Sequence, residues 1–476
     1  MWAAPGGAIL PRSQDVRDDR RVRPEHAAMC CLLFGAGCER AQAEPEQGLA
    51  APTSAAAGSR ALGPQASPVG GGVEPDRTVL WLGGDVLPSP SITRAATELG
   101  AGDAAAGWAR MVEPLARLWR QDGDDAIVIL NQEAPVAELR VANDAYEGSQ
   151  APGHRFARSP LDAPLWQPRA LALAGVDVAV LANNHSLDQL RDGLAETLDA
   201  LDAAGVRALG AGRAPNAREP LEAGVGSARV AVAAYFLRDQ PEPPLSEGRA
   251  GIAVLDARTH DEVRELARTH DAVVVVFHVE GELYPTPGGD WIRWPRALVE
   301  DGADVVVIHG PHVVQRVERI RAGSRDGVVA WSVGNFLSGM GVYAEPGRPE
   351  LAEDDKWTTP RARDGLLVRV EVTAAPQGSS ARAGVQVDVL PFFVDNTRPL
   401  VEDRLAVAPM RYVVRPLAAC GPSAPLDDWP AAARSATGRW LDAQRDRILA
   451  KTGLESPACR LAPGRAAGLA QLLPVP

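Results

Sequence analysis

The chain has 476 residues, of which 46% are hydrophobic and 23% charged, a composition typical of a globular protein with a sizeable core. This composition excludes a wholly disordered chain, and 5 cysteines with 46 unrepeated glycines exclude a disulfide scaffold and a collagen-like protein. A net charge of −12 without a basic stripe argues against nucleic-acid binding, and no stretch reaches the ~18 apolar residues of a membrane span.

The beginning of the chain has the pattern of an export leader followed by a linker. Arginines precede a short apolar run, and small residues then precede Cys38, as in a secretory signal. The segment FGAGC resembles a bacterial lipobox, although Gly35 stands where leucine is usual, and it predicts a lipid anchor at Cys38 in the cell envelope. We expect a signal over 1–38 and a disordered linker over 39–77. The apolar run is short and lies late, which a true start near Met29 would explain. The alternative is a disordered leader whose apolar stretch is accidental.

The middle of the chain alternates short apolar runs with helical patterns. Continuous β-branched runs predict buried strands, and alternating runs predict half-exposed strands. The continuous runs begin at Thr78, Ala126, Val176, Ala228, Ala272, Ala303 and Gly327, and the alternating runs begin at Leu366 and Val385. Helices are expected over 190–204, 261–267 and 291–301. The pattern predicts one α/β domain over 78–400, whose later strands become antiparallel, and an extension over 401–476.

Polar side chains follow six of the continuous runs, at the point where each strand ends. Ligand sites in α/β sheets form at the carboxyl ends of strands, so we expect these side chains to converge. Each alone has an ordinary explanation as a turn residue, a helix cap or a buried histidine, but the repetition favours a site. Carboxylates, amides and imidazoles without cysteine suit a divalent Mn, Mg, Zn or Fe ion. The residues are Asp85, Asn131, Glu133, Asn183, Asn184, His185, Asp188, His278, Glu280, Glu282, His309, His312 and Asn335.

The same residue types point to phosphoester chemistry. A pair of ions about 3.5–4 Å apart clamps the attacking and leaving oxygens of a phosphoester displacement. In that scheme His185 is the general acid or orients the scissile phosphate oxygen. Acyl transfer is less favoured, because Ser186 follows His185 directly and the sequence has no nucleophile-elbow motif. The sequence also has no P-loop and no Rossmann glycine fingerprint.

Six motifs occur in a familiar order. They are GGDVLPS at 83–89, NQEAPVA at 131–137, VDVAVLANNHSLD at 176–188, HVEGELY at 278–284, GADVVVIHGPH at 302–312 and SVGNFLS at 332–338. Together they resemble the CapA family, proteins linked to bacterial capsule and poly-γ-glutamate synthesis, which is similar in fold to the calcineurin-like metallophosphoesterases. The resemblance implies a metallophosphoesterase-like α-β-β-α sandwich with mixed sheets, and its core motifs cover 78–338.

The family motifs, together with the strand-end pattern, assign roles to these positions. We expect metal ligands at Asp85, Asn131, Glu133, Asn184, His278, His309 and His312, catalytic roles for His185, Asn184 and Glu282, and substrate contacts from Asn335, Asp188 and Arg155. Four positions depart from the pattern. Glu280 and Ile308 replace glycines, Gly310 replaces a histidine, and Leu87 takes the second place of the opening Asp-x-His pair. These departures argue against a complete two-metal centre and leave one metal, or a metal-free polar pocket, open.

Two functions are compatible with these features. One is an exported metal-dependent hydrolase that cleaves a phosphoester or a bond in an envelope polymer or its precursor. The other is a non-catalytic protein that holds a growing anionic polymer beside other capsule synthesis proteins. An acidic protein needs a metal or arginines for this, and His154, Arg155 and Arg158 are candidates unless they form a solvated loop. In an oxidising compartment Cys420 and Cys459 are expected to pair, or else are unrelated thiols.

Overall fold

The computed structural model describes the central domain and parts of the later chain. The expected leader, the linker up to residue 76, Arg155 and the pair Cys420 and Cys459 lie outside the described residues. None of the helices within the described ranges is long and apolar enough to cross a membrane. The described ranges are 77–138, 161–224, 228–238, 246–342, 356–357, 359–375, 382–396, 412–416, 445–452 and 470–471.

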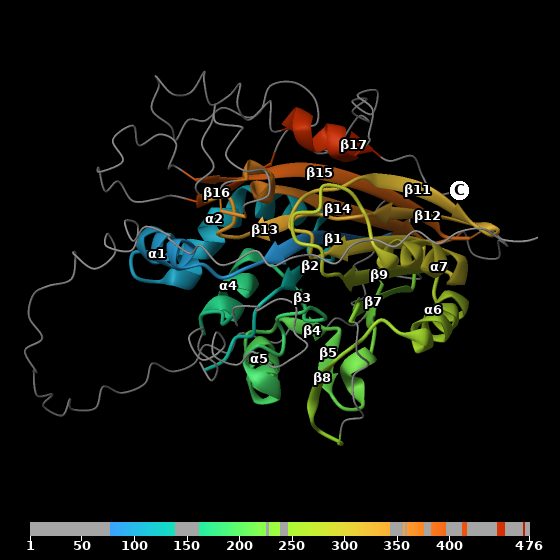
Figure 1. The fold of residues 1–476 in the computed structure, drawn as a ribbon, viewed down its shortest axis with the longest axis horizontal. Helices are drawn as coiled ribbons and strands as arrows, with labels where there is room; N and C mark the ends of the chain where they lie inside the picture. The colour runs from blue at the N-terminus through green and yellow to red at the C-terminus, as the bar shows by residue number, and fades with distance from the viewer. Residues whose placement is uncertain are drawn as a thin grey trace, which may run out of the picture. The chain divides into compact units, whose positions relative to one another are not determined.

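The first sheet is mixed, with a parallel half and an antiparallel half (Figure 1). Its strands are β1 (Arg77–Val86), β2 (Ile127–Gln132), β3 (Val178–Val180), β4 (Arg207–Leu209), β13 (Asn335–Leu337), β14 (Asp364–Thr373), β15 (Gly384–Asn396), β16 (Tyr412–Pro416) and β17 (Ala470–Gln471). The order is β16-β15-β14-β1-β2-β3-β4, with β13 beside β1 and β17 beside β15. Strands β1 to β4 are parallel, whereas β14, β15 and β16 are antiparallel to their neighbours. The predicted change to antiparallel pairing late in the chain is therefore present.

The second sheet has a parallel centre flanked by one antiparallel strand on each side. Its strands are β6 (Leu221–Ala223), β7 (Val230–Phe236), β9 (Ala272–His278), β10 (Val305–His309), β11 (Val317–Ala322) and β12 (Arg325–Ala330), in the order β11-β12-β10-β9-β7-β6. All of β9 is buried, which explains its unbroken apolar sequence. Two short strands, β5 (Ala211–Arg213) and β8 (Ala250–Ile252), form a separate antiparallel pair.

The helices of the described residues connect these strands. They are α1 (Pro90–Leu99), α2 (Ala104–Trp119), α4 (Gln167–Ala174), α5 (Leu190–Ala203), α6 (Ala257–Thr269), α7 (Arg293–Asp301), a helical segment at 445–452, and short 3-10 turns at Arg120–Asp122, Asn216–Arg218, Asp290–Ile292 and Pro360–Arg363. Helix α6 begins at a capping box in which Asp256 and Thr259 bond each other's backbone. It is longer than the predicted 261–267, because the cap lies outside the apolar pattern on which that prediction rested.

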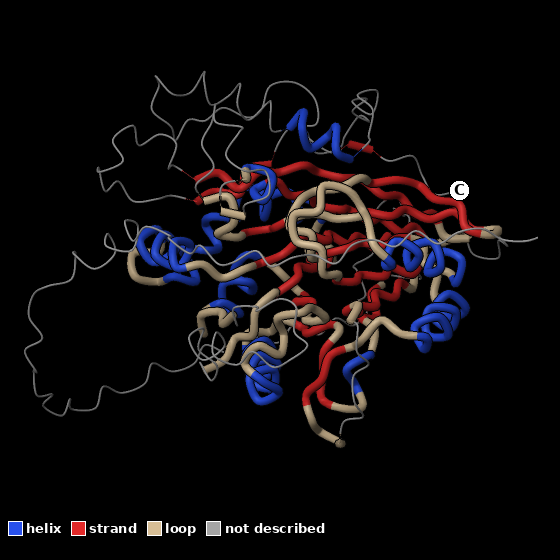
Figure 2. The backbone as a smooth tube through the Cα atoms, in the orientation of Figure 1, coloured by secondary structure: helices blue, strands red, loops and turns tan. Residues whose placement is uncertain are grey.

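Side chains of β9 alternate between two cores. Val274 and Val276 join the large core shared with the first sheet, whereas Val273, Val275 and Phe277 pack in the cluster that includes α6 and α7 residues. The second sheet therefore lies between the first sheet and an outer helix layer, and Figure 2 shows the strands stacked between helices. On the first sheet, Trp108 and Trp119 of α2 lie 6.4 Å from the ring of Phe336. The expected α/β sandwich with mixed sheets is confirmed.

Segments of the expected C-terminal extension join the first sheet. Strand β16 pairs with β15, and β17 pairs with β15 at Asp388 and Val389. In the helical segment at 445–452, the Arg447 guanidinium bonds the Asp364 carboxylate at 2.5 and 3.0 Å. These parts of the extension therefore contribute contacts to the main domain.

Candidate metal centre

The register of the two sheets brings the strand ends together. Asp85 at the end of β1 is paired with Asn131 of β2 and with Asn335 of β13. In the second sheet, the last residue of β9, His278, is paired with the last residue of β10, His309. Five residues that follow or end different apolar runs in the sequence thus meet at one edge of the sandwich.

Hydrogen bonds then fix the orientation of the amide and carboxylate groups. Asn131 Nδ2 donates to Asp85 Oδ1 at 2.8 Å, and Asn183 Nδ2 donates to Asn131 Oδ1 at 3.1 Å. His312 Nδ1 lies 3.1 Å from Asp85 Oδ2 and 3.0 Å from Asn335 Oδ1. The sequence assigned Asn183 neither a ligand nor a catalytic role. In the structure Asn183 donates to Asn131 and accepts the backbone N–H of His185. Its signal in the sequence was the first Asn of the Asn-Asn-His motif.

Asp85, Glu133 and His278 form the candidate metal centre. Each offers one ligand atom, all three atoms lie within 4.8 Å of one another, and all three residues are buried. Glu133 Oε1 is 3.5 Å from His278 Nε2 and 3.6 Å from His312 Nε2. Within the described residues, both Glu133 oxygens are buried without a hydrogen-bond partner. A buried carboxylate without partners is costly, and a bound cation removes that cost.

The electrostatics of the centre point the same way. Burial raises the pKa of Glu133 well above its usual value, and the negative charge of Asp85 raises it further. Burial opposes ionisation of Asp85 too, but the hydrogen bond from His312 and the nearby imidazoles hold its pKa well below the usual range. Burial lowers the pKa of His278 and of His309 and so favours their neutral, ligating forms. The pKa of His312 is raised to about 10, because Glu133 and Asp85 outweigh the effect of burial.

These donors fit a divalent ion. Two carboxylates and a neutral imidazole are suitable ligands for Mn, Fe or Zn, and carboxylates also for Mg. Two more buried atoms at the strand ends, Asn184 Oδ1 and His309 Nδ1, have no hydrogen-bond partner among the described residues. The other nitrogen of His309, Nε2, donates to Gly83 O at 3.0 Å. Asn131 and His312, both expected as ligands, each contact Asp85 through a side-chain nitrogen. Their expected role as ligands stays a prediction.

His185 is held by a carboxylate at the side of the centre. Its Nδ1 lies 2.6 Å from Asp188 Oδ2, which also accepts the backbone N–H of Leu161 at 2.7 Å. Because Nδ1 is engaged, Nε2 is the ring nitrogen left to face a ligand. The charge of His185 contributes to the lowered pKa of His278, so the two rings belong to one electrostatic unit. Asp188, expected as a substrate contact, is placed as a partner of His185.

Two other expected residues lie at the border of the buried centre. Glu282 is half exposed, with its Oε1 3.4 Å from Lys356 Nζ, and its negative charge adds to the raised pKa values of Glu133 and His312, after the larger effects of burial and the nearer groups. Its expected catalytic role stays a prediction. Asn335 is buried and uses its amide nitrogen to bond the carbonyls of His312 and Ala362, which makes it a support for the His312 loop.

The geometry explains why glycine occupies position 310. Gly310 has φ +106, and a Cβ there would lie 1.9 Å from Val279 O and 2.9 Å from His278 Nε2. A side chain at this position would collide with the backbone and with a candidate ligand. A histidine at position 310 is therefore incompatible with the observed approach of β10 to β9.

Comparison with known proteins identifies the family. Residues 79–340 match the family described as "Bacterial capsule synthesis protein PGA_cap". The chain is similar to the "Capsule biosynthesis protein CapA" of Bacillus anthracis, with 28% identity over 36% of this chain and 43% of that protein. It is also similar to a "Probable polyglutamine synthesis accessory protein" of Mycobacterium tuberculosis, with 26% identity over 52% of this chain and 72% of that protein. The chain thus spans less than half the length of the Bacillus relative.

Solved structures give weaker overlaps. A 5'-nucleotidase precursor from Thermus thermophilus is 14% identical, covering 65% of this chain and 54% of its own, with a TM-score of 0.34. The NAD nucleotidase of Haemophilus influenzae is 9% identical, covering 80% of this chain and 60% of its own, with a TM-score of 0.37. The family match covers more than half of the chain and contains every residue of the candidate metal centre. This protein belongs to the bacterial capsule synthesis protein family.

Proposed function

We propose that this protein is a metal-dependent hydrolase of capsule or poly-γ-glutamate synthesis. Its substrate would be a phosphoester, or a bond in an anionic envelope polymer or its precursor. Family membership and the names of the relatives support the link to polymer synthesis. The observation that carries the proposal is Glu133, a fully buried carboxylate whose oxygens both lack a partner among the described residues, beside the buried carboxylate of Asp85.

The chain's own residues divide the chemistry between them. Asp85, Glu133 and His278 would hold the ion, which when bound polarises a substrate oxygen and lowers the pKa of bound water. His185 would donate a proton from Nε2 to the leaving oxygen. Asp188 would stabilise the charged imidazole and fix the ring through the 2.6 Å contact at Nδ1. Asn183 and Asn131 keep Asp85 oriented toward the centre.

The proposed site of action is outside the cytoplasm. The leader pattern over 1–38 and Cys38 supports export and lipid attachment. Mass spectrometry of the membrane fraction would detect a lipid-modified N-terminus at Cys38. An intact Met1 in the cytoplasm would refute this part of the proposal.

Metal content and activity on a generic aryl phosphate test the hydrolase. We expect at least one ion per wild-type chain and a strong loss of metal in Asp85→Ala. His185→Ala should retain the metal, but its activity should fall by about 10²–10⁴-fold. His260→Ala is the matched control, because His260 Nδ1 also contacts a carboxylate, Asp301, at 2.5 Å, but lies on α6 away from the site. It should leave metal and activity unchanged. Absence of metal, or activity that persists in both site variants, would refute the proposed hydrolase activity.

A non-catalytic polymer-binding protein is the second candidate. Gly310 favours it, because the close contacts at this position exclude one histidine of a fuller ligand set. This candidate predicts an oligoglutamate affinity that does not change in His185→Ala, together with no turnover of phosphoester or polymer.

A further inference from the structure

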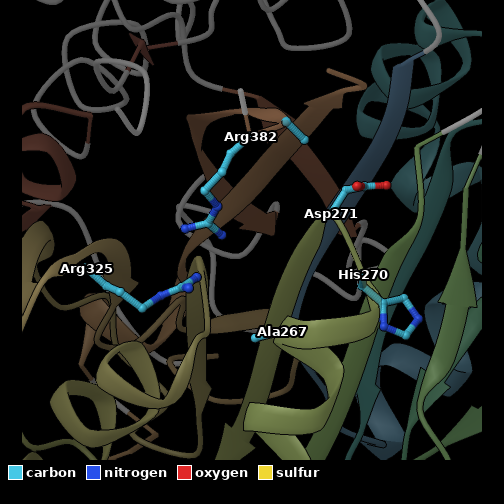
Figure 3. Close-up of a pocket in the computed structure, with 6 residues that line it drawn as sticks. Ala267, His270, Asp271, Arg325 and Arg382 are labelled. Carbon is cyan, nitrogen blue, oxygen red and sulfur yellow. The ribbon is translucent and has the colours of Figure 1, made fainter. Parts of the chain in front are cut away.

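A second polar pocket lies at the opposite end of the second sheet. It is lined by Ala267, His270, Asp271, Arg325, Arg382 and Ala383, with a volume of about 320 Å³ (Figure 3). Asp271 immediately precedes β9, whereas His278 of the metal centre is the last residue of that strand. At ~3.3 Å per residue, the length of β9 places the two sites roughly 20 Å apart. The pocket is therefore separate from the metal centre.

Two arginines in this pocket share one carboxylate as their hydrogen-bond acceptor. Arg325 Nη2 and Arg382 Nη2 each donate to Asp304 Oδ1 at 3.2 Å. The other oxygen of Asp304 is occupied, since it accepts the backbone N–H of Val273 at 2.9 Å. The group of two guanidiniums and one carboxylate therefore carries an excess of one positive charge. Asp304 therefore neutralises only one of the two guanidinium charges.

Arg325 also has unused hydrogen-bonding capacity. Its Nη2 additionally donates to Gly302 O at 2.8 Å, but its Nε is buried without a hydrogen-bond partner in the described part of the chain. Burial lowers the pKa of Arg325, although the guanidinium remains the charged form at neutral pH. A buried N–H donor without an acceptor is costly, and an anion at this position would supply the acceptor.

The other titratable groups of the pocket are engaged elsewhere. Asp271 Oδ2 accepts the backbone N–H of Arg229 at 2.7 Å, and His270 Nε2 lies 2.5 Å from Glu222 Oε2. In Figure 3 the guanidiniums of Arg325 and Arg382 approach each other, whereas His270 and Asp271 point away from them. Asp271, the acidic residue of the pocket lining, therefore lies to one side of the arginine pair.

We propose that Arg325 and Arg382 form a binding site for an oxyanion, either a carboxylate or a phosphate group. Planar guanidiniums match the paired oxygens of such groups and bind them more strongly than neutral donors do. The site lies apart from the metal centre and goes beyond the proposed hydrolysis. A carboxylate polymer and free phosphate share this chemistry, and the choice of probe distinguishes them.

Calorimetric titration of the full chain in an Asp85→Ala background tests the proposal, because that background disables the metal centre. The probes are inorganic phosphate and γ-linked pentaglutamate. We expect saturable binding of at least one probe and about tenfold weaker binding in Arg382→Gln, as for loss of one charge-assisted hydrogen bond. Arg325→Gln should weaken binding similarly. Arg382 is more than half exposed, so its variant keeps the test valid if Arg325→Gln fails to fold.

Arg321→Gln is the matched control, because Arg321 is an exposed arginine of β11 beside Asp326. It should change affinity by less than about twofold, as expected of an exposed charge. Binding of pentaglutamate alone would assign the site to carboxylates, and binding of phosphate would show that a single oxyanion suffices. No saturable binding of either probe, or equal weakening by Arg321→Gln, would overturn the proposal. Neither result depends on whether the metal centre hydrolyses a substrate.

Discussion

Two buried clusters of charge in this protein are built in opposite ways. In the Arg369 cluster, formed by Arg369, Asp122, Glu371 and Asp388, one guanidinium bonds three carboxylates at 2.7 to 3.4 Å. In the metal centre, the carboxylates lie together, and neither oxygen of Glu133 has a hydrogen-bond partner in the described ranges.

The difference separates a structural cluster from a ligand site. Burial works against the charge of Arg369, yet the hydrogen bonds and charges of Asp122 and Glu371 raise its pKa above the usual value. Each carboxylate there accepts a hydrogen bond from Arg369, and Arg77 also pairs with Glu371, so no carboxylate of the cluster lacks a donor. At the metal centre the pKa of Glu133 is also raised, but for an acid this disfavours the charged form, and the causes are burial and the negative charge of Asp85. His312 Nε2 lies 3.6 Å from Glu133 Oε1, but neither Glu133 oxygen accepts a hydrogen bond from the described residues, and a bound cation would fill that gap.

The largest expected effect comes from removing the guanidinium of the Arg369 cluster. Arg369→Met should lower the free energy of unfolding by about 3–5 kcal/mol, because the buried Asp388 and the part-buried Asp122 and Glu371 lose their common partner. The effect should not depend on added metal. Urea unfolding measures it, with Arg117→Met as control: Arg117 is exposed and pairs with Glu113, so its loss should cost less than about 1 kcal/mol. Equal effects of the two variants would contradict the assignment of the Arg369 cluster to stability.

Asp364 is an intermediate case, since Arg447 is its ion-pair partner. Burial raises its pKa to about 6, although Arg447 opposes the shift. A raised acid pKa means that the folded state binds more protons between about pH 4 and pH 6. The contribution of Asp364 to stability is thus complete below pH 4 and is lost as the pH rises through 6.

Asp364→Asn removes that dependence on pH. The unfolding free energy of the variant relative to the wild type should therefore increase by about 2–3 kcal/mol between pH 4 and pH 7. Urea unfolding across this range is the measurement. A difference that stays constant with pH would show that the ion pair with Arg447 fully compensates burial, as in the Arg369 cluster.

The smallest expected effect is also the most specific to the metal centre. With a chelator present at pH 8, Glu133→Gln should be more stable than the wild type by about 1–2 kcal/mol, because a buried carboxylate that accepts no hydrogen bond is removed. With Mn²⁺ present the order should reverse, since only the wild type is stabilised by binding the ion. Asp122→Asn is the control and should be destabilised under both conditions. If Glu133→Gln is destabilised in the chelator as well, Glu133 is a structural acid and not a ligand.

Much of the site could be predicted from local sequence. A continuous β-branched run followed by Asp85, Asn131 or His278 reveals both a buried strand and the polar group at its end. Parallel strands place such ends at one edge, so convergence followed from pattern and topology together. The predicted helix over 190–204 agrees with α5 at Leu190–Ala203 for the same reason, since its apolar period is local.

Contacts between distant segments could not be predicted in this way. Glu282 and Lys356, for example, are far apart in the chain and form an ion pair at 3.4 Å. Arg325 and Arg382 carried no signal at all, and they meet only because both bond Asp304.

The composition, the strand ends and their polar residues were thus determined by the sequence alone, because each depends on neighbours a few residues away. The tertiary structure decided which buried acids have hydrogen-bond partners, because such a partner can lie anywhere in the chain. Asp122 and Arg369 are far apart in sequence and bond at 2.7 Å, whereas Glu133 meets another acid, Asp85. That contrast, invisible in the sequence, distinguishes a cluster of hydrogen-bonded charges from a candidate metal centre.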